Sequence, residues 1–162
     1  MQCDFTQTKH NKLLSKDIQS KGKMYFKQPD KLRWQYTSPY DYTFIMNGDK
    51  VSLNDKQIDA QKNKIFRQIT SIILGSITGG GLKSATDFNV ELYKTDNEYF
   101  AKLYPKKKEV KQVYQLIEIH FNTALTMVSS VKMMEKTGDT TTVTLSNTKI
   151  NASIDESHFS LR

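Results

Sequence analysis

Residues 32–53 carry a period-two pattern that fits paired β-strands and excludes an amphipathic helix. Leu32, Trp34 and Tyr36 are separated by single polar residues. After Pro39, the same spacing resumes at Tyr42, Phe44 and Met46, and then at Val51 and Leu53. Asn47-Gly48-Asp49 between the last two runs is a hairpin signal. The segment therefore predicts an antiparallel meander whose large apolar side chains share one face.

Further strand candidates occupy most of the remaining chain. They are residues 3–8, 24–26, 88–93, 99–104, 116–122, 126–136 and 140–149, with a short final element expected between Ile154 and Leu161. Pro105-Lys106-Lys107-Lys108 is interpreted as a basic turn, and Lys136 to Asp139 as another turn. About nine or ten short strands are expected in total, which favours a barrel or a strongly curved antiparallel sheet.

One segment, Lys62 to Thr78, has helical spacing instead. Its apolar residues recur at intervals of one, three and four and fall on one stripe: Ile65, Phe66, Ile69, Ile72, Ile73 and Ile77. Gly79-Gly80-Gly81 would end this helix. Because isoleucine is a mediocre helix former, the helix is expected to depend on packing against another element.

Composition restricts the protein class but not the partner. The 162 residues suit one domain, and the net charge of +7 is compatible with nucleic acid, anionic lipid or an acidic protein. No apolar run reaches the roughly 20 residues that span a bilayer. Cys3 is the single cysteine, so no intrachain disulfide is possible, and it is interpreted as a small buried residue.

The residues of a catalytic or metal site are not apparent. His10, His120 and His158 do not stand at metal-ligand spacing from a Cys, Asp or Glu, apart from a weak pair of Glu118 and His120. Neither a nucleophile elbow nor a phosphate-binding loop is present. We therefore expect no enzymatic activity, no metal and no cofactor.

The aromatic strands and the apolar helix admit two readings. They are either an ordinary packed core or the walls of a cavity for a flexible apolar ligand such as an acyl chain. A cluster of lysines at 102, 106, 107, 108 and 111 would meet anionic headgroups or a partner, or would simply be solvated. A basic nucleic-acid-binding β domain is a further alternative, although Trp34 and Tyr36 are expected on the buried face.

Several stretches resemble the LolA-type periplasmic outer-membrane lipoprotein carriers, most closely the divergent members of Bacteroides-type bacteria. They are Phe5-Thr6-Gln7, Ser20 to Phe26, Lys27 to Tyr36 with its Pro-Asp-Lys-Leu-Arg-Trp turn, Thr37-Ser38-Pro39 and Asn47 to Val51. The likeness is specific over the first third. The rest matches as a pattern of elements.

The resemblance implies a mainly β fold with a helical lid (α+β). Its centre would be an incomplete, strongly curved antiparallel half-barrel covering a hydrophobic cavity, formed by residues 1–162 as one domain. It also implies a periplasmic protein, made with a signal peptide and a first helix that precede this chain. Its expected partners are acylated lipoprotein cargo, an inner-membrane ABC-type releasing complex and an outer-membrane acceptor. A carrier of another lipid or glycolipid is the alternative.

Site residues follow from the resemblance together with the pattern. The expected lipid-binding residues are Leu32, Trp34, Tyr36, Phe44, Met46, Leu53, Phe66, Ile69, Ile73, Ile77 and Met133. The family's lid would be closed by an Arg before the turn proline, but this chain has Gln28 there. A neutral amide can still bond to carbonyls of the lid, although without charge assistance.

Overall fold

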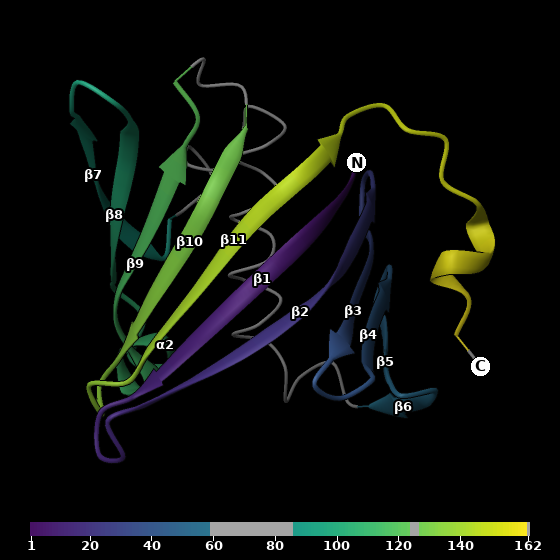
Figure 1. Ribbon diagram of the computed structural model, residues 1–162, viewed down its shortest axis with the longest axis horizontal. Coiled ribbons are helices and arrows are strands. Elements are labelled where there is room, and N and C mark those ends of the chain that lie inside the picture. The colour runs from purple at the N-terminus through teal and green to yellow at the C-terminus, as the bar shows by residue number, and fades with distance from the viewer. Residues whose placement is uncertain (59–85, 124–126, 162) are drawn as a thin grey trace. The chain divides into compact units, whose positions relative to one another are not determined.

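The computed structural model describes residues 1–58, 86–123 and 127–161. Figure 1 shows long antiparallel strands with two short helical elements. The strands are β1 (Gln2–Asn11), β2 (Lys16–Lys27), β3 (Lys31–Ser38), β4 (Tyr42–Asn47), β5 (Lys50–Leu53), β6 (Lys56–Ile58), β7 (Phe88–Lys94), β8 (Tyr99–Pro105), β9 (Tyr114–Phe121), β10 (Val128–Glu135) and β11 (Thr140–Lys149). The helical elements are α2 (Lys108–Val113) and the 3-10 helix η1 (Glu156–Phe159).

The strands follow the order β6-β5-β4-β3-β2-β1-β11-β10-β9-β8-β7, with β6 and β7 at the two edges. Pairing is antiparallel from β2 to β6 and from β7 to β11. The sheet is therefore not closed into a barrel, which confirms the predicted mainly β fold. Within the described ranges, no helix has the length and apolar content that crossing a bilayer requires.

The chain forms two compact units. The first consists of Met1–Gln7, Gln19–Asn63 and Leu145–Arg162, and the second of Thr8–Ile18 and Lys64–Thr144. Strands β1, β2 and β11 contribute residues to both units.

The strands of the first unit form where the sequence alternates. In β3, Leu32 and Trp34 are buried, while Arg33 and Gln35 between them are half-buried. The β4–β5 connection places Gly48 at the first central turn position with φ of +59°, a conformation that glycine adopts at little cost. This short turn fixes the pairing of β4 with β5, and the predicted meander is confirmed.

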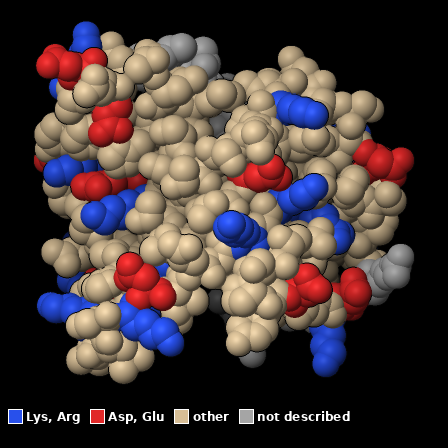
Figure 2. Space-filling view, viewed as in Figure 1, with Lys and Arg blue, Asp and Glu red and all other residues tan. Residues whose placement is uncertain are grey.

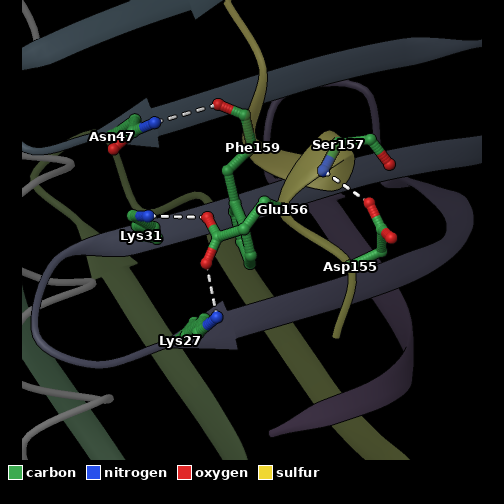
Figure 3. Close-up of polar contacts among 7 residues, drawn as sticks. All are labelled: Lys27, Lys31, Asn47, Asp155, Glu156, Ser157 and Phe159. Atoms are coloured by element: carbon green, nitrogen blue, oxygen red, sulfur yellow. Dashed lines mark hydrogen bonds and ion pairs between the residues drawn. The ribbon is translucent and has the colours of Figure 1, made fainter. Parts of the chain in front are cut away.

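The C-terminal segment packs on β2, β3 and β4 of the first unit (Figure 3). Phe159 is completely buried, and its carbonyl accepts a hydrogen bond from Asn47 Nδ2 at 3.2 Å. Glu156 is held by the ammonium groups of Lys27 and Lys31. The Asp155 carboxylate caps η1 by accepting from the Ser157 N–H at 2.8 Å. The predicted short element around Phe159 is thus present and anchored to the sheet.

The second unit has one apolar face and one aromatic, charged face. Cross-strand neighbours Ala101, Ile119 and Val131 are buried on the first. On the other, the Phe100 ring stacks on Tyr93 and on His120, with centroids 5.0 and 5.3 Å away.

Four details of the sequence-based expectation were incomplete or wrong. The strand expected at 24–26 begins at Lys16, β6 was not expected, and the strands number eleven among the described residues. The basic turn was predicted to include Lys108, but α2 begins there. Helix α2 has no capping side chain at Lys107, and burial of Val110 holds it in place. Because the sequence signal of a helix start is missing, the helix could not be predicted from local sequence. The helix expected at Lys62 to Thr78 lies outside the described residues.

We predict that the C-terminal segment stabilises the first unit less as the pH falls. Hydrogen bonds from Lys27 and then Lys31 lower the pKa of Glu156 below its ordinary value of 4.5. Because the folded-state pKa is the lower one, the stabilisation is complete above about pH 4.5 and disappears as the pH falls through the folded-state pKa. Urea unfolding should show wild type more stable than Glu156→Gln at neutral pH, with the two converging in acid.

The variant that combines Lys27→Met with Lys31→Met provides the control for this prediction. Where Lys27→Met and Lys31→Met are already present, Glu156→Gln should leave the free energy of unfolding unchanged across the pH range. A difference between wild type and Glu156→Gln that persists undiminished in acid would contradict the assignment.

Candidate functional site

The pairing register of β2 to β5 collects large apolar side chains on one side of the first unit. Trp34 pairs with Met24 and with Phe44, and Leu32 pairs with Phe26 and with Met46. In β5, Val51 pairs with Met46 and Leu53 with Phe44. Successive side chains of a strand point to opposite sides, so these residues share one side. We call this set the apolar face: Met24, Phe26, Leu32, Trp34, Phe44, Met46, Val51 and Leu53.

The aromatic end of the apolar face is built around Gly22. The Phe5 ring from β1 lies directly over this glycine, and a Cβ there would come within 2.5 Å of the ring. The Phe5 centroid is 4.4 Å from that of Trp34 and 5.1 Å from that of Tyr36, the second contact being edge-to-face. A glycine inside a strand often marks such a close approach.

Tyr36 extends the aromatic contacts towards solvent. Its hydroxyl donates a hydrogen bond to Gln7 Oε1 at 2.8 Å, and burial raises its pKa. The Tyr42 ring lies beyond it, 5.8 Å away between centroids, and is 38% exposed. Tyr36 and Tyr42 thus form the polar margin of an otherwise apolar surface.

Trp34 is a buried aromatic side chain at this end of the apolar face, 8% exposed. Its indole lies close to Tyr36: hydrogen bonding with Trp34 lowers the pKa of the Tyr36 hydroxyl, against the larger rise that burial causes. The polar atom of the indole therefore lies near the polar margin formed by Tyr36.

The opposite side of β2, β3 and β4 has a different character. Arg33 Nη1 donates to the His158 carbonyl at 3.3 Å, and the His158 ring stacks on Tyr25 with centroids 4.3 Å apart. Together with the Lys27, Lys31 and Glu156 contacts, these bonds occupy this side with the C-terminal segment (Figure 3). The apolar face is the other side of these strands, where seven of its eight side chains are buried and Leu53 is half-buried.

The structure places the predicted site residues in three groups. Six of them lie together on the apolar face or at its margin: Leu32, Trp34, Tyr36, Phe44, Met46 and Leu53. Met133 belongs to the second unit, where it pairs with Ile117 and Thr141. Gln28 is exposed in the β2–β3 turn. Phe66, Ile69, Ile73 and Ile77 lie outside the described residues, and so does any lid contact of Gln28.

Sequence reasoning missed several neighbours of these residues. Met24, Phe26 and Val51 were recognised as strand residues but were not assigned to the site, although they complete the apolar face. Phe5 was missed because its contact depends on the pairing of strands. The isolated Gly22 inside an aromatic strand was the available signal. A pocket of about 180 Å³ elsewhere in this unit has a polar lining that includes Asp4, Lys23 and Lys149, and none of the predicted residues line it.

Groups with catalytic potential are already engaged in structural contacts. His120 Nδ1 lies 2.9 Å from Glu98 Oε2, and its Nε2 lies 3.8 Å from Glu118 Oε2. No cluster of three or more His, Cys, Asp or Glu residues in the described part of the chain is arranged to hold a metal. Cys3 is buried, and desolvation raises the pKa of its thiol to about 12, which leaves it unreactive.

We predict that Gly22→Ala disrupts the aromatic end of the apolar face. The added methyl would meet the Gln35 carbonyl oxygen at 2.0 Å as well as the Phe5 ring, and the backbone oxygen cannot move aside without breaking β2–β3 pairing. Overpacking of this kind costs about 1–3 kcal/mol. Urea unfolding should show this loss for Gly22→Ala, whereas Lys23→Ala at the next, exposed position should stay within about 0.5 kcal/mol of wild type. Equal stabilities of the two variants would contradict the contact.

The sequence matches known proteins over nearly its full length. The family model described as "Outer membrane lipoprotein carrier protein LolA" matches residues 1–162. A protein from Methylococcus capsulatus named outer-membrane lipoprotein carrier protein is 25% identical over 160 residues, covering 98% of this chain and 75% of the relative. A protein of the same name from Pseudoalteromonas translucida is 28% identical over 144 residues, covering 88% of this chain and 66% of the relative.

Solved structures support the fold at much lower sequence identity. The crystal structure of MucB has a TM-score of 0.54 at 10% identity, covering 98% of this chain and 56% of that one. The Pseudomonas aeruginosa MucA/MucB complex gives a TM-score of 0.50 at 8% identity, covering 99% of this chain and 56% of that one. At such identities the likeness concerns the fold alone. Because the LolA family model covers the whole chain, this protein belongs to the LolA family of outer-membrane lipoprotein carriers.

Proposed function

We propose that this protein carries lipoproteins through the periplasm, from the inner to the outer membrane, by holding their acyl chains against the apolar face of β2 to β5. The single observation that supports the proposal most is the segregation of side chains in the first unit. Eight large apolar side chains share one side, and the other side is occupied by the C-terminal segment. The family to which the chain belongs is named for such carriers.

The acyl chains would be held by reversible burial of their apolar surface, and no covalent bond would be made or broken. Each methylene removed from water contributes roughly 0.8 kcal/mol, so one acyl chain would supply most of the binding free energy. Met24 and Met46 suit such cargo because their side chains adapt to a flexible partner.

The other residues proposed to contact lipid are Phe66, Ile69, Ile73 and Ile77, which lie outside the described residues, and Met133. The partners would be acylated lipoproteins, an inner-membrane ABC-type releasing complex that supplies them, and an outer-membrane acceptor. The protein would need neither a cofactor nor enzymatic activity for this role.

We predict that a charge on the apolar face weakens cargo binding. Leu53 is half-buried at the edge of this face, opposite Phe44. Leu53→Lys would force the chain to bury an ammonium group beside the ligand, which should weaken binding of a triacylated lipopeptide at least about tenfold. Thr43→Lys is the matched control, because Thr43 precedes Phe44 on the same strand and points to the other side.

Isothermal titration calorimetry with the lipopeptide and its deacylated peptide would measure the effect. Wild type and Thr43→Lys should bind the acylated form and not the bare peptide. Equal affinity of all three proteins, or equal binding of both peptides, would refute the proposal. Mass spectrometry of lipid extracted from the purified protein would identify a different carrier function if a glycolipid or another lipid were found.

A further inference from the structure

The tip of the β1–β2 hairpin exposes two adjacent leucines. We define the hairpin tip as residues 12–15, Lys12-Leu13-Leu14-Ser15, all in the second unit. Leu13 is 92% exposed and Leu14 is 72% exposed, and Ile18 on the following strand is 49% exposed. A single exposed leucine is ordinary on a protein surface. Two adjacent exposed leucines at the end of a projecting turn form a small convex apolar surface. Packing within the second unit does not explain this exposure.

The hairpin tip is held in a defined shape. The Leu14 N–H donates to Asn11 Oδ1 at 2.9 Å, which closes the turn. The Asp139 carboxylate, in the neighbouring β10–β11 turn, accepts from the Lys12 N–H at 3.0 Å and from Asn11 Nδ2 at 3.3 Å. These bonds fix the backbone below the leucines, so their exposure is a property of the folded second unit.

Around the hairpin tip, the acidic side chains have bonding partners whereas several lysines form no ion pair. Each nearby carboxylate has a partner: Asp17 bonds His10 at 2.6 Å, Glu135 lies 3.8 Å from Lys9, and Asp139 accepts the two bonds described above. Lys12, Lys16 and Lys136, by contrast, form no ion pair among the described residues. Figure 2 shows uncharged surface at this projecting end, in the lower left of the view, with both basic and acidic side chains beside it.

Two exposed leucines flanked by three lysines without an ion pair among the described residues match the chemistry of an anionic bilayer surface. Leucine side chains gain free energy at the boundary of the acyl chains, while lysines bury their stems and keep their ammonium groups at the phosphates. Basic residues near the surface add electrostatic attraction to anionic lipids. A convex tip offers no groove for a peptide or a helix, whereas a bilayer adapts to its shape.

We propose that the hairpin tip is a membrane-contact site that inserts Leu13 and Leu14 into the interface of an anionic bilayer. The contact is weak and reversible, because two leucines bury less apolar surface than one myristoyl chain, which by itself gives marginal membrane binding. The proposal concerns the protein without cargo and does not depend on the lipoprotein-carrier function proposed above.

Vesicle flotation of the cargo-free full chain tests this site. The vesicles contain phosphatidylethanolamine and phosphatidylglycerol, and phosphatidylcholine vesicles serve as the uncharged reference. Leu13→Ser with Leu14→Ser should reduce binding to the anionic vesicles about tenfold without changing the net charge. Leu92→Ser, at a position that is also 72% exposed but on edge strand β7, should bind like wild type.

A fluorescent label reports insertion directly. Because Cys3 is buried with its thiol pKa raised to about 12, Ser15→Cys can be labelled selectively with an environment-sensitive dye. On anionic vesicles, the emission of the dye attached to Ser15→Cys should shift to the blue. The emission of the same dye attached to Asp96→Cys, in the exposed β7–β8 turn, should not shift. Unchanged flotation of the double variant would overturn the proposal. So would loss of self-association in sedimentation velocity without loss of vesicle binding, because the tip would then be a contact between copies.

Discussion

The pairing register of β2, β3, β4 and β5 is the constraint on which the first unit depends. With Trp34 opposite Phe44 and Leu32 opposite Met46, eight large apolar side chains of these strands face one way, whereas Ile45 faces the other way beside Arg33. A slip of one residue would move Arg33 to that side and Trp34 to the other. Two features oppose the slip: the short turn at Gly48, and the C-terminal bonds to Lys31, Arg33 and Asn47.

The same arrangement separates stability from binding. Phe159 and its neighbours bury one side of the strands, so the fold does not rely on a ligand there. The apolar face on the other side carries the large side chains that the proposed function requires. This contrast between the two sides connects the fold to the proposed carrier role.

The sequence predicts this unit well where local pattern and tertiary packing agree. Alternation across Leu32 to Leu53 and the Asn47-Gly48 signal define β3, β4, β5 and six members of the predicted site. Prediction fails where distant residues decide the structure. The Phe5 ring meets Gly22 only because β1 and β2 pair, Glu156 reaches Lys27 across 129 positions in the chain, and α2 has no capping residue. Met133 shares the apolar character of the site residues, but its position in the second unit is not encoded in local spacing.

Quenching of Trp34 fluorescence by brominated acyl chains would test whether bound acyl chains lie against the apolar face. Trp34 is the single tryptophan, and because it is already buried, a shift of its emission maximum would say little. Bromine atoms on an acyl chain, by contrast, quench an indole that they touch. We expect strong, saturable quenching by a lipopeptide with brominated acyl chains and none by the unbrominated form. Full binding of the brominated lipopeptide without loss of Trp34 emission would contradict the claim, because the acyl chains would then lie away from the apolar face.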